Sequence, residues 1–236
     1  MKRPAPRPRD FAVGAFAFAV AALCVGMGIW QLNRLDTRRA RNATIIAARA
    51  RPPIELQGRR LSADSARNRR IHARGVYDFA HERRWPGRTR MDVPGVALLT
   101  PLRLPDGAAV FVDRGWVPSA DAWHVDLGAW REPESADVNG LGLSAPRDRS
   151  DVNPAALADS LPYPVLPFVV VLLPGDSGAA RSRPLRWAAP APDNGPHLSY
   201  AIQWFSFAVI VVVGTVALLR KSYLEQGRQT GTAGTV

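Results

Sequence analysis

The chain has 236 residues, a single cysteine and a formal net charge of +11. One cysteine excludes an internal disulfide framework and a two-cysteine metal clamp. The charge invites a nucleic-acid interpretation, but of the 31 basic residues only Lys2 and Lys221 are lysine. Many of the arginines flank apolar segments, where basic residues commonly set membrane topology, and none forms a recognised nucleic-acid module. We therefore expect no nucleic-acid partner.

Residues 11–32 form an apolar run of spanning length and predict a transmembrane helix. The preceding residues 1–10 are basic and proline-rich, which predicts a disordered cytoplasmic tail. A cleaved signal peptide is the competing interpretation, but the run continues past Cys24 to Trp30 and exceeds a typical signal core. Small residues recur in this run at helical spacing and would let another helix approach closely; they are Ala15, Ala19, Ala22 and Gly26.

Residues 197–219 predict a second transmembrane helix, because no charged side chain occurs from Leu198 to Leu219. Two spans place both termini on one side of the lipid bilayer, and the basic residues of the tails favour the cytoplasm. Residues 220–236 are then a cytoplasmic tail. Residues 33–196 are predicted to form an extracytoplasmic domain, in a periplasm-like space.

The region between the spans is typical of a β-rich domain that begins with a helix. Residues 34–51 predict a helix continuing from the first span, and Pro52–Pro53 stop it. Short apolar runs bounded by turn residues predict strands at 71–79, 96–104, 109–117, 138–144 and 168–173. The predicted fold class is an α+β membrane protein, with two transmembrane helices flanking a mostly antiparallel β domain that contains a few short helices.

Three local signals refine this domain. Asp106-Gly107 predicts a hairpin turn between two strands, because such turns need positive backbone angles. Asn153 predicts the cap of a short helix over 154–161, with proline at its first position. Residues 181–196 are rich in proline and polar residues and predict a tether into the second span.

No motif in the chain supports an enzyme with its own catalytic residues. The four histidines show no metal-ligand spacing on one helix, and neither a phosphate-binding loop nor a nucleophile elbow occurs. Asp113 beside Arg114 is interpreted as a structural ion pair at a strand end.

The two predicted spans bring a distinctive set of side chains to one depth, because consecutive membrane helices are antiparallel. The set is Trp30, Gln31 and Arg34 from the first span, and His197, Tyr200 and Trp204 from the second. One interpretation is an aromatic belt with a snorkelling arginine. The other is a haem pocket at the membrane surface, since a neutral imidazole is a good axial ligand and arginine can pair with a propionate.

Three motifs occur in order and at fixed places relative to the spans. The first span ends Gly28-Ile29-Trp30-Gln31-Leu32-Asn33-Arg34, the domain contains GVALLTPL (95–102) and VDRGWVP (112–118), and the second span opens HLSYAIQWF (197–205). Over residues 11–221 this set resembles the Surfeit locus protein one family, the assembly factors of haem–copper cytochrome oxidases. Asp113 stands where asparagine is common in that family.

The resemblance implies a membrane protein that helps place haem a into the largest subunit of cytochrome oxidase, and not an enzyme. Bacterial members are thought to bind haem a, and His197 matches their candidate ligand for the haem iron. Trp30, Gln31 and Arg34 match the family's first motif, and Arg114, Gly115 and Trp116 match the second. The matched residues also have structural interpretations: Gly115 permits close backbone approach, Trp116 fills a core, and Gln31 bonds helix to helix.

Two hypotheses for the function therefore stay open. In the first, the protein binds haem a transiently and aids its insertion into the oxidase. In the second, it is a haem-free scaffold that stabilises an oxidase subunit or the haem a synthesis enzyme. A ligand-sensing receptor is disfavoured, because the polar tail after Lys221 offers no output module.

Overall fold

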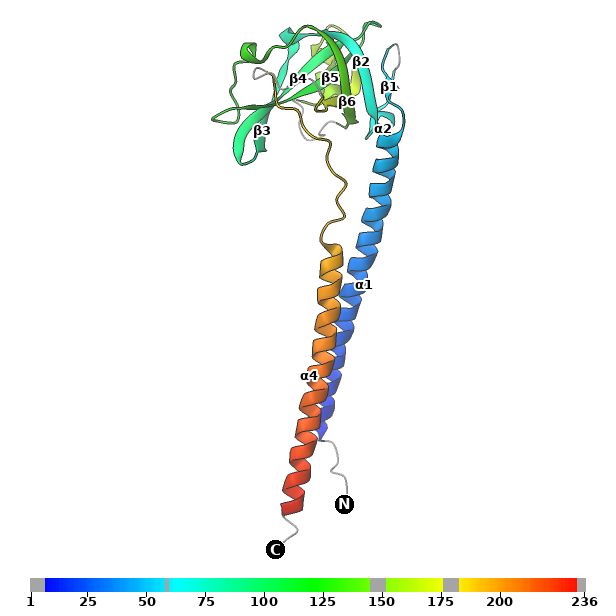
Figure 1. Cartoon of the computed structure of the whole chain (residues 1–236), viewed down its shortest axis with the longest axis vertical. Helices are drawn as coiled ribbons and strands as arrows, with labels where there is room; N and C mark the ends of the chain where they lie inside the picture. Colours follow the sequence, from blue (N-terminus) through cyan, green and yellow to red (C-terminus); the bar gives the residue numbers. More distant parts are fainter. Residues whose placement is uncertain (1–6, 58–59, 145–151, 176–182, 233–236) are drawn as a thin grey trace. The chain divides into compact units, whose positions relative to one another are not determined.

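The computed structural model describes residues 7–57, 60–144, 152–175 and 183–232 (Figure 1). The chain divides into two compact units. One contains residues 1–44 and 192–236, and the other contains residues 45–191. The first unit is a pair of long helices and the second is a β domain, and each is described by itself.

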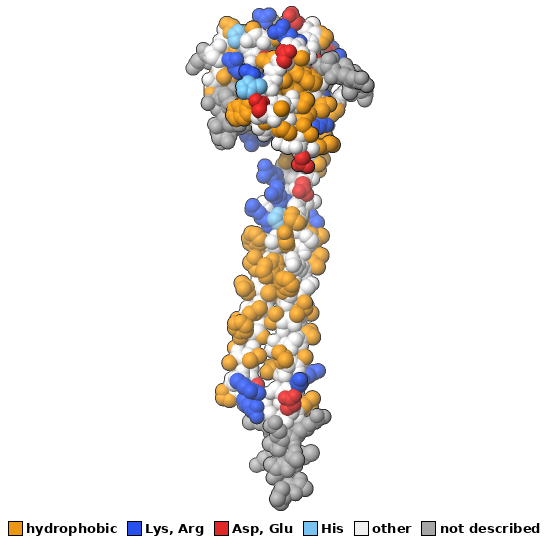
Figure 2. Space-filling view, turned by 90° about the vertical axis from the view of Figure 1, so that its left-hand side faces the viewer, with side chains coloured by type: hydrophobic (Ala, Val, Ile, Leu, Met, Phe, Trp, Pro, Cys, Tyr) orange, Lys and Arg blue, Asp and Glu red, His pale blue; other side chains and the backbone are white. Residues whose placement is uncertain are grey.

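The helix pair consists of α1 (Pro8–Ala50) and α4 (His197–Thr232). Both are long and apolar enough to cross a membrane, and only 11% and 6% of their most apolar windows is buried. Figure 2 shows the apolar side chains as a band along the pair, with basic side chains at each end. As predicted, α1 continues without a break through the polar residues after the apolar run and ends just before Pro52. The helix α4 continues beyond the apolar run to Thr232.

The first ten residues only partly follow the prediction of a disordered tail. Residues 1–6 lie outside the described part of the chain. Residues 8–10 already belong to α1, and Asp10 accepts a hydrogen bond from the backbone N–H of Arg7 (3.0 Å). A carboxylate in the first turn is favourable there, because the helix dipole is positive at that end.

The helices meet along a seven-residue repeat. The buried residues of α1 are Ala21, Cys24, Gly28, Gln31, Leu35 and Asn42. On α4 the buried residues include Ala201 and Ala208, which are also seven apart. Spacings of three, four and seven place these side chains on one face, as in a left-handed helix pair. Ala15, Ala19, Ala22 and Gly26, which were expected to admit another helix, lie exposed outside this seam.

The β domain is built on one seven-stranded sheet. Its strands are β1 (Ile54–Glu55), β2 (Arg70–Tyr77), β3 (Arg83–Arg90), β4 (Val93–Arg103), β5 (Ala109–Pro118), β6 (Ser135–Leu143) and β7 (Val165–Leu172). The order across the sheet is β1-β2-β6-β7-β5-β4-β3, and β2 also pairs with β4. Five strands therefore close into a ring, with β1 and β3 outside it. Among the strand pairs of the described residues, only β1–β2 and β5–β7 are parallel, so the predicted mostly antiparallel sheet is confirmed.

The predicted strands all occur, with boundaries shifted by up to three residues. The predicted hairpin turn joins β4 and β5, but only Gly107 of the Asp-Gly pair has positive φ (+83°). Asn153 accepts from the N–H of Ala155 (3.1 Å) and caps α3 (Pro154–Leu157), which is shorter than predicted because a 3₁₀ turn follows it. The helix α2 (Ala63–Ala66) and the strands β1 and β3 were not predicted.

Side-chain alternation gives the ring an apolar interior. Inward positions of all five ring strands form one buried cluster, to which β5 contributes Val110 and Val112. The intervening Phe111 belongs to a second cluster outside the ring, covered by Leu157 of α3. The same alternation sends Asp113 and Arg114 to opposite faces of β5. The expected ion pair between them is therefore wrong.

His72 fastens the outer strand β1 to the ring. Its Nδ1 lies 2.6 Å from an oxygen of Glu55 on β1, and its Nε2 lies 2.5 Å from an oxygen of Asp137 on β6. Hydrogen bonds to Glu55 and then to Asp137 raise the pKa of His72. Those to His72 and Arg74 lower the pKa of Asp137. One imidazole thus links three strands by charge-assisted hydrogen bonds.

Asp113 provides a pH test of this fold. Burial raises the pKa of its carboxyl from 3.8 to about 6, although the N–H of Gly115 donates to it at 2.9 Å. Because the folded pKa is the higher one, stability is lost as pH rises from about 4 through about 6. We expect Asp113→Asn to raise the stability by about 1–3 kcal/mol at pH 7.5 and to have no such effect near pH 4.

Thermal unfolding of both proteins in detergent, followed by circular dichroism across this pH range, measures the difference. Asparagine keeps the oxygen that accepts from Gly115, so the comparison isolates the charge. An equal or lower melting temperature for the variant at pH 7.5 would contradict a buried, ionised Asp113.

Candidate functional site

The two helices hold His197 and Gln31 in direct contact. The ring Nδ1 of His197, the first residue of α4, lies 2.8 Å from Oε1 of Gln31 on α1. Gln31 is 9% exposed and occupies the seam between Gly28 and Leu35. The amide oxygen can only accept, so Nδ1 carries the proton and donates. In the neutral imidazole, the lone pair is then on the other ring nitrogen, Nε2.

The Nε2 edge of His197 is bordered by a residue without a side chain. Gly195 has φ of +68°, and a Cβ built there would lie 3.5 Å from both Cδ2 and Nε2 of the ring. Its N–H donates to the Asp193 side chain (2.9 Å), which forms the turn before the helix. A neutral imidazole whose Nδ1 is held by an acceptor is the usual state of a metal-ligating histidine. The residues present therefore fit an axial ligand for haem iron.

The other predicted site residues lie on these helices with different surroundings. Trp30 and Tyr200 are 53% and 47% exposed, and Arg34 is exposed. Trp204 is half-buried and packs edge-on against Phe207, with ring centroids 5.9 Å apart. Of the six residues, hydrogen bonding joins only Gln31 and His197 in the described part of the chain.

Two contacts that the sequence analysis missed support this pair. The amide Nδ2 of Asn42 donates to Oδ1 of Asn194 (2.9 Å), which ties the segment before His197 to α1. The ring of Phe205 packs over Gly28, where a Cβ would come within 2.6 Å of it. Gly28 and Phe205 both belong to the motifs at the helix ends, but which residues meet across the pair depends on the helix register, which the sequence does not show.

In the β domain, Arg114 is the centre of a buried ionic cluster. Its side chain is 0% exposed and continues the inward row of Val110 and Val112. The guanidinium donates to Glu82 (2.5 Å), Glu132 (3.0 Å), Thr100 (2.8 Å) and the carbonyl of Trp130 (2.8 Å). Arg186 joins the cluster by donating to Glu132 (2.5 Å) and to the carbonyl of Arg114.

Gly115 and Trp116 hold the segment that leads towards α4. The backbone of Trp116 exchanges two hydrogen bonds with Leu185, at 2.9 and 2.7 Å. Gly115 has φ of +124°, and a Cβ there would lie 2.5 Å from the carbonyl oxygen of Leu185. The indole of Trp116 is buried, and its N–H donates to the carbonyl of Arg88 (3.0 Å). Residues 114–116 thus hold Leu185 and Arg186 in place through backbone contacts.

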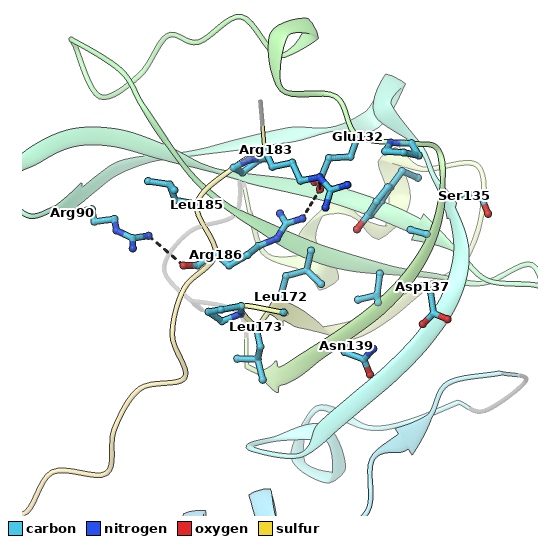
Figure 3. Close-up of a pocket in the computed structure, with 17 residues that line it drawn as sticks. Arg90, Glu132, Ser135, Asp137, Asn139, Leu172, Leu173, Arg183, Leu185 and Arg186 are labelled. Carbon is cyan, nitrogen blue, oxygen red and sulfur yellow. Dashed lines mark hydrogen bonds and ion pairs between the residues drawn. The ribbon is translucent and has the colours of Figure 1, made fainter. Parts of the chain in front are cut away.

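A cavity of roughly 590 Å³ lies beside this segment, between β6, the end of β7 and residues 183–186 (Figure 3). Its charged lining is already engaged. Arg186 pairs with Glu132, Arg90 donates to the carbonyl of Arg186 (3.2 Å), and Asp137 pairs with Arg74. Within the described residues no cluster of three or more His, Cys, Asp or Glu could hold a metal ion. The lining shown in Figure 3 therefore presents a mainly structural network.

Comparison with known proteins decides the family. The model of the SURF1 family matches residues 18–209 of this chain. The chain belongs to the SURF1 family. It is also similar to a SURF1-like protein of Monosiga brevicollis, at 25% identity over 236 residues, covering 89% of this chain and 88% of that protein. These matches confirm the predicted resemblance. The SURF1 family is generally known as a family of oxidase assembly factors, not of enzymes.

Removing the guanidinium of Arg114 tests the buried cluster. We expect Arg114→Met to lower the stability by about 3–5 kcal/mol, because two buried carboxylates lose their partner. The matched control is Arg74→Met, since Arg74 is 61% exposed in its pair with Asp137; it should cost under about 1 kcal/mol. Thermal unfolding of the full chain in detergent compares the two. Equal losses of stability in Arg114→Met and Arg74→Met would mean that the ionic cluster around Arg114 is not shielded from water.

Alanine substitutions at two glycines with positive φ distinguish the cost of backbone strain from the cost of a clash with a neighbouring segment. Gly115→Ala should lower the stability by about 1–3 kcal/mol through backbone strain. The new Cβ should also push Leu185 away. Gly107→Ala is the control, because its φ is +83° and a Cβ there meets nothing within 4 Å. Hydrogen exchange of the amide of Leu185 should rise at least tenfold in Gly115→Ala alone. Unchanged exchange there would contradict the anchoring role.

Proposed function

We propose that the chain is a membrane-anchored assembly factor for a haem–copper cytochrome oxidase, which binds haem a transiently through His197. The hydrogen bond between His197 and Gln31 carries this proposal. Of the two neutral tautomers, it selects the one whose Nε2 carries the lone pair, which is the form that can coordinate haem iron. The partner that receives the haem would be the largest oxidase subunit.

The surrounding residues have defined roles in this proposal. Trp30 and Tyr200 offer exposed aromatic surface on which a porphyrin can pack, and Trp204 extends this face of α4 by one turn. Arg34 offers a guanidinium for a propionate. Haem a supplies the redox chemistry only after delivery, within the oxidase. The chain itself orients the imidazole, accepts a hydrogen bond from its Nδ1 through Gln31, and offers an apolar surface to the cofactor.

Both α1 and α4 are proposed to cross the inner membrane of a bacterium, with residues 33–196 on the periplasmic or extracellular side. Their exposed apolar bands support this arrangement, because lipid is the solvent that suits such surfaces. Gln31 and His197 then lie where the apolar run of each helix meets polar residues. A cofactor with an apolar body and charged propionates suits that boundary.

A haem-free scaffold is the second candidate function. The exposed small-residue stripe of α1, which α4 leaves uncovered, favours it. Small residues let a further membrane helix approach closely. The partner in that case would be a membrane helix of an oxidase subunit or of the haem a synthesis enzyme.

Purification from cells that make haem a separates the two candidates. The wild-type chain should carry haem detectable by its absorption spectrum, and His197→Ala should lose at least nine-tenths of it. His197→Met keeps a possible ligand atom and should shift the bands. His124→Ala is the control, because His124 pairs with Asp121 on an exposed loop of the β domain.

Gln31 can be tested separately as the residue that fixes the tautomer of His197. Gln31→Leu should weaken haem binding about 10- to 100-fold, the usual effect of removing a partner of a ligating histidine. Gln203→Leu makes the same change at an exposed position of α4 and should leave binding unchanged. A colourless wild-type protein that still retains oxidase subunits in mild detergent would overturn the haem proposal and support the scaffold.

A further inference from the structure

The first half of β6 has one paired edge and one open edge. The carbonyl of Glu134, just before the strand, accepts from the N–H of Tyr77 on β2 (2.8 Å). Backbone groups alternate between the two edges of a strand, so those of Ser135 and Asp137 point away from β2. Both residues are exposed. Among the described residues, no hydrogen bond reaches the backbone N–H or C=O of either one on this edge.

This edge is open because β7 ends before it reaches the start of β6. The two strands pair from Gly140 onwards, and the last contact is the N–H of Leu173 donating to the carbonyl of Asn139 (3.4 Å). The segment that continues the sheet beside β5 is bonded to β5 instead, because both backbone groups of Leu185 pair with Trp116. The cavity of roughly 590 Å³ lies between that segment and the open half of β6 (Figure 3). The ring of strands therefore has a gap here, and an unpaired strand edge faces it.

Unpaired backbone groups at alternate positions are a template for another extended chain. From Ser135 to Asn139 the open edge is five residues long, about 17 Å. It lacks the proline and lysine that commonly protect strand edges, and its one charged side chain, Asp137, is held by His72 and Arg74. Main-chain hydrogen bonds to such an edge are an established mode of peptide recognition.

The inner wall of the cavity favours an apolar side chain. Ala136 and Val138 of β6 belong to the apolar interior of the ring, and Leu172 and Tyr77 belong to the same cluster and line the cavity. The phenol of Tyr77 makes no hydrogen bond within the described part of the chain. Burial raises the pKa of Tyr77 to about 12, so the phenol is neutral and can donate to a carbonyl. The inward side chains of an added strand would thus meet an apolar wall with one donor.

The outer rim of the cavity favours an acidic side chain, because Arg183 is held loosely. Its Nε lies 3.8 Å from Glu132, and 42% of its side chain is exposed. Glu132 already accepts from Arg114 (3.0 Å) and Arg186 (2.5 Å). Arg183 is therefore the third cation around one carboxylate. Its guanidinium is left to attract a carboxylate from outside the domain.

We propose that the open half of β6 binds an extended segment of a partner protein as an added strand, with an apolar side chain in the cavity and an acidic side chain at Arg183. The site lies wholly within the β domain, so it depends neither on haem binding nor on the crossing of a membrane. The added strand fills the gap in the ring and satisfies the free backbone groups of Ser135 and Asp137.

A peptide of alternating valine and glutamate, blocked at both ends, tests the site on the full chain in detergent. In the free protein, the amides of Ser135 and Asp137 should exchange hydrogen at least tenfold faster than those of Ala136 and Val138, which face β2. Millimolar peptide should slow exchange at Ser135 and Asp137 at least tenfold. Equally slow exchange in the free protein would mean that the chain covers this edge itself, and would overturn the proposal. Unchanged exchange with the peptide would overturn it too.

A substitution at the first residue of β6 isolates the main-chain contribution. Ser135→Pro removes one N–H from the open edge at a position where strands tolerate proline. It should weaken peptide binding at least tenfold without lowering the melting temperature. Ser135→Ala is the matched control, because it keeps the N–H and should bind as the wild type does. Equal binding by the proline and alanine variants would contradict strand addition.

N-methylated peptides make the same test without changing the protein. Methylating all the valines, or all the glutamates, removes the donors along one edge of the peptide, and at least one of the two peptides should bind at least tenfold more weakly. Full binding by both would overturn strand addition. Arg183→Gln should weaken binding of the valine–glutamate peptide about three- to fivefold, and should not affect a valine–glutamine peptide. Equal effects on the two peptides would contradict the preference for an acidic partner.

Discussion

The hydrogen bond between Gln31 and His197 sets the register of the helix pair. From Ala21 to Leu35, the seam around Gln31 otherwise contains only small and apolar residues among the buried positions of α1. A buried amide without a partner is costly in apolar surroundings, so the register in which Oε1 meets an imidazole N–H is selected over its neighbours. Gly28 permits that register, because the ring of Phe205 occupies the space of its missing side chain. Helix packing and histidine orientation therefore have one cause.

The β domain depends on a different constraint, the buried guanidinium of Arg114. Apolar side chains of the same volume often give as much stability as a buried ionic cluster, but this cluster needs several partners in place at once. Glu82, Glu132 and Arg186 come from separate segments, and each must be in place to satisfy the others. The cluster thereby places the segment around Leu185, from which the chain continues towards α4.

The sequence predicted those features that depend on local patterns, and it missed those that depend on strand order. Apolar runs predicted five strands, whereas β3 was missed because RRWPGRTR is mostly polar and owes its conformation to pairing with β4 and to arginine–tryptophan contacts. Antiparallel spans were enough to bring Gln31 level with His197. The partners of Arg114 lie 18 and 32 residues away on other segments, so adjacency wrongly suggested Asp113.

The environment of His197 is one-sided, which bears on the choice between a carrier and a permanent haem protein. Gln31 covers the Nδ1 edge, whereas Gly195 places no side chain on the Nε2 edge. Trp30 and Tyr200 keep about half of their surface exposed. Under the proposed function, a receiving subunit can approach the Nε2 edge without separating α1 from α4, so the histidine keeps its tautomer during transfer. A site enclosed on every side would have to break the helix seam before it could release its cofactor.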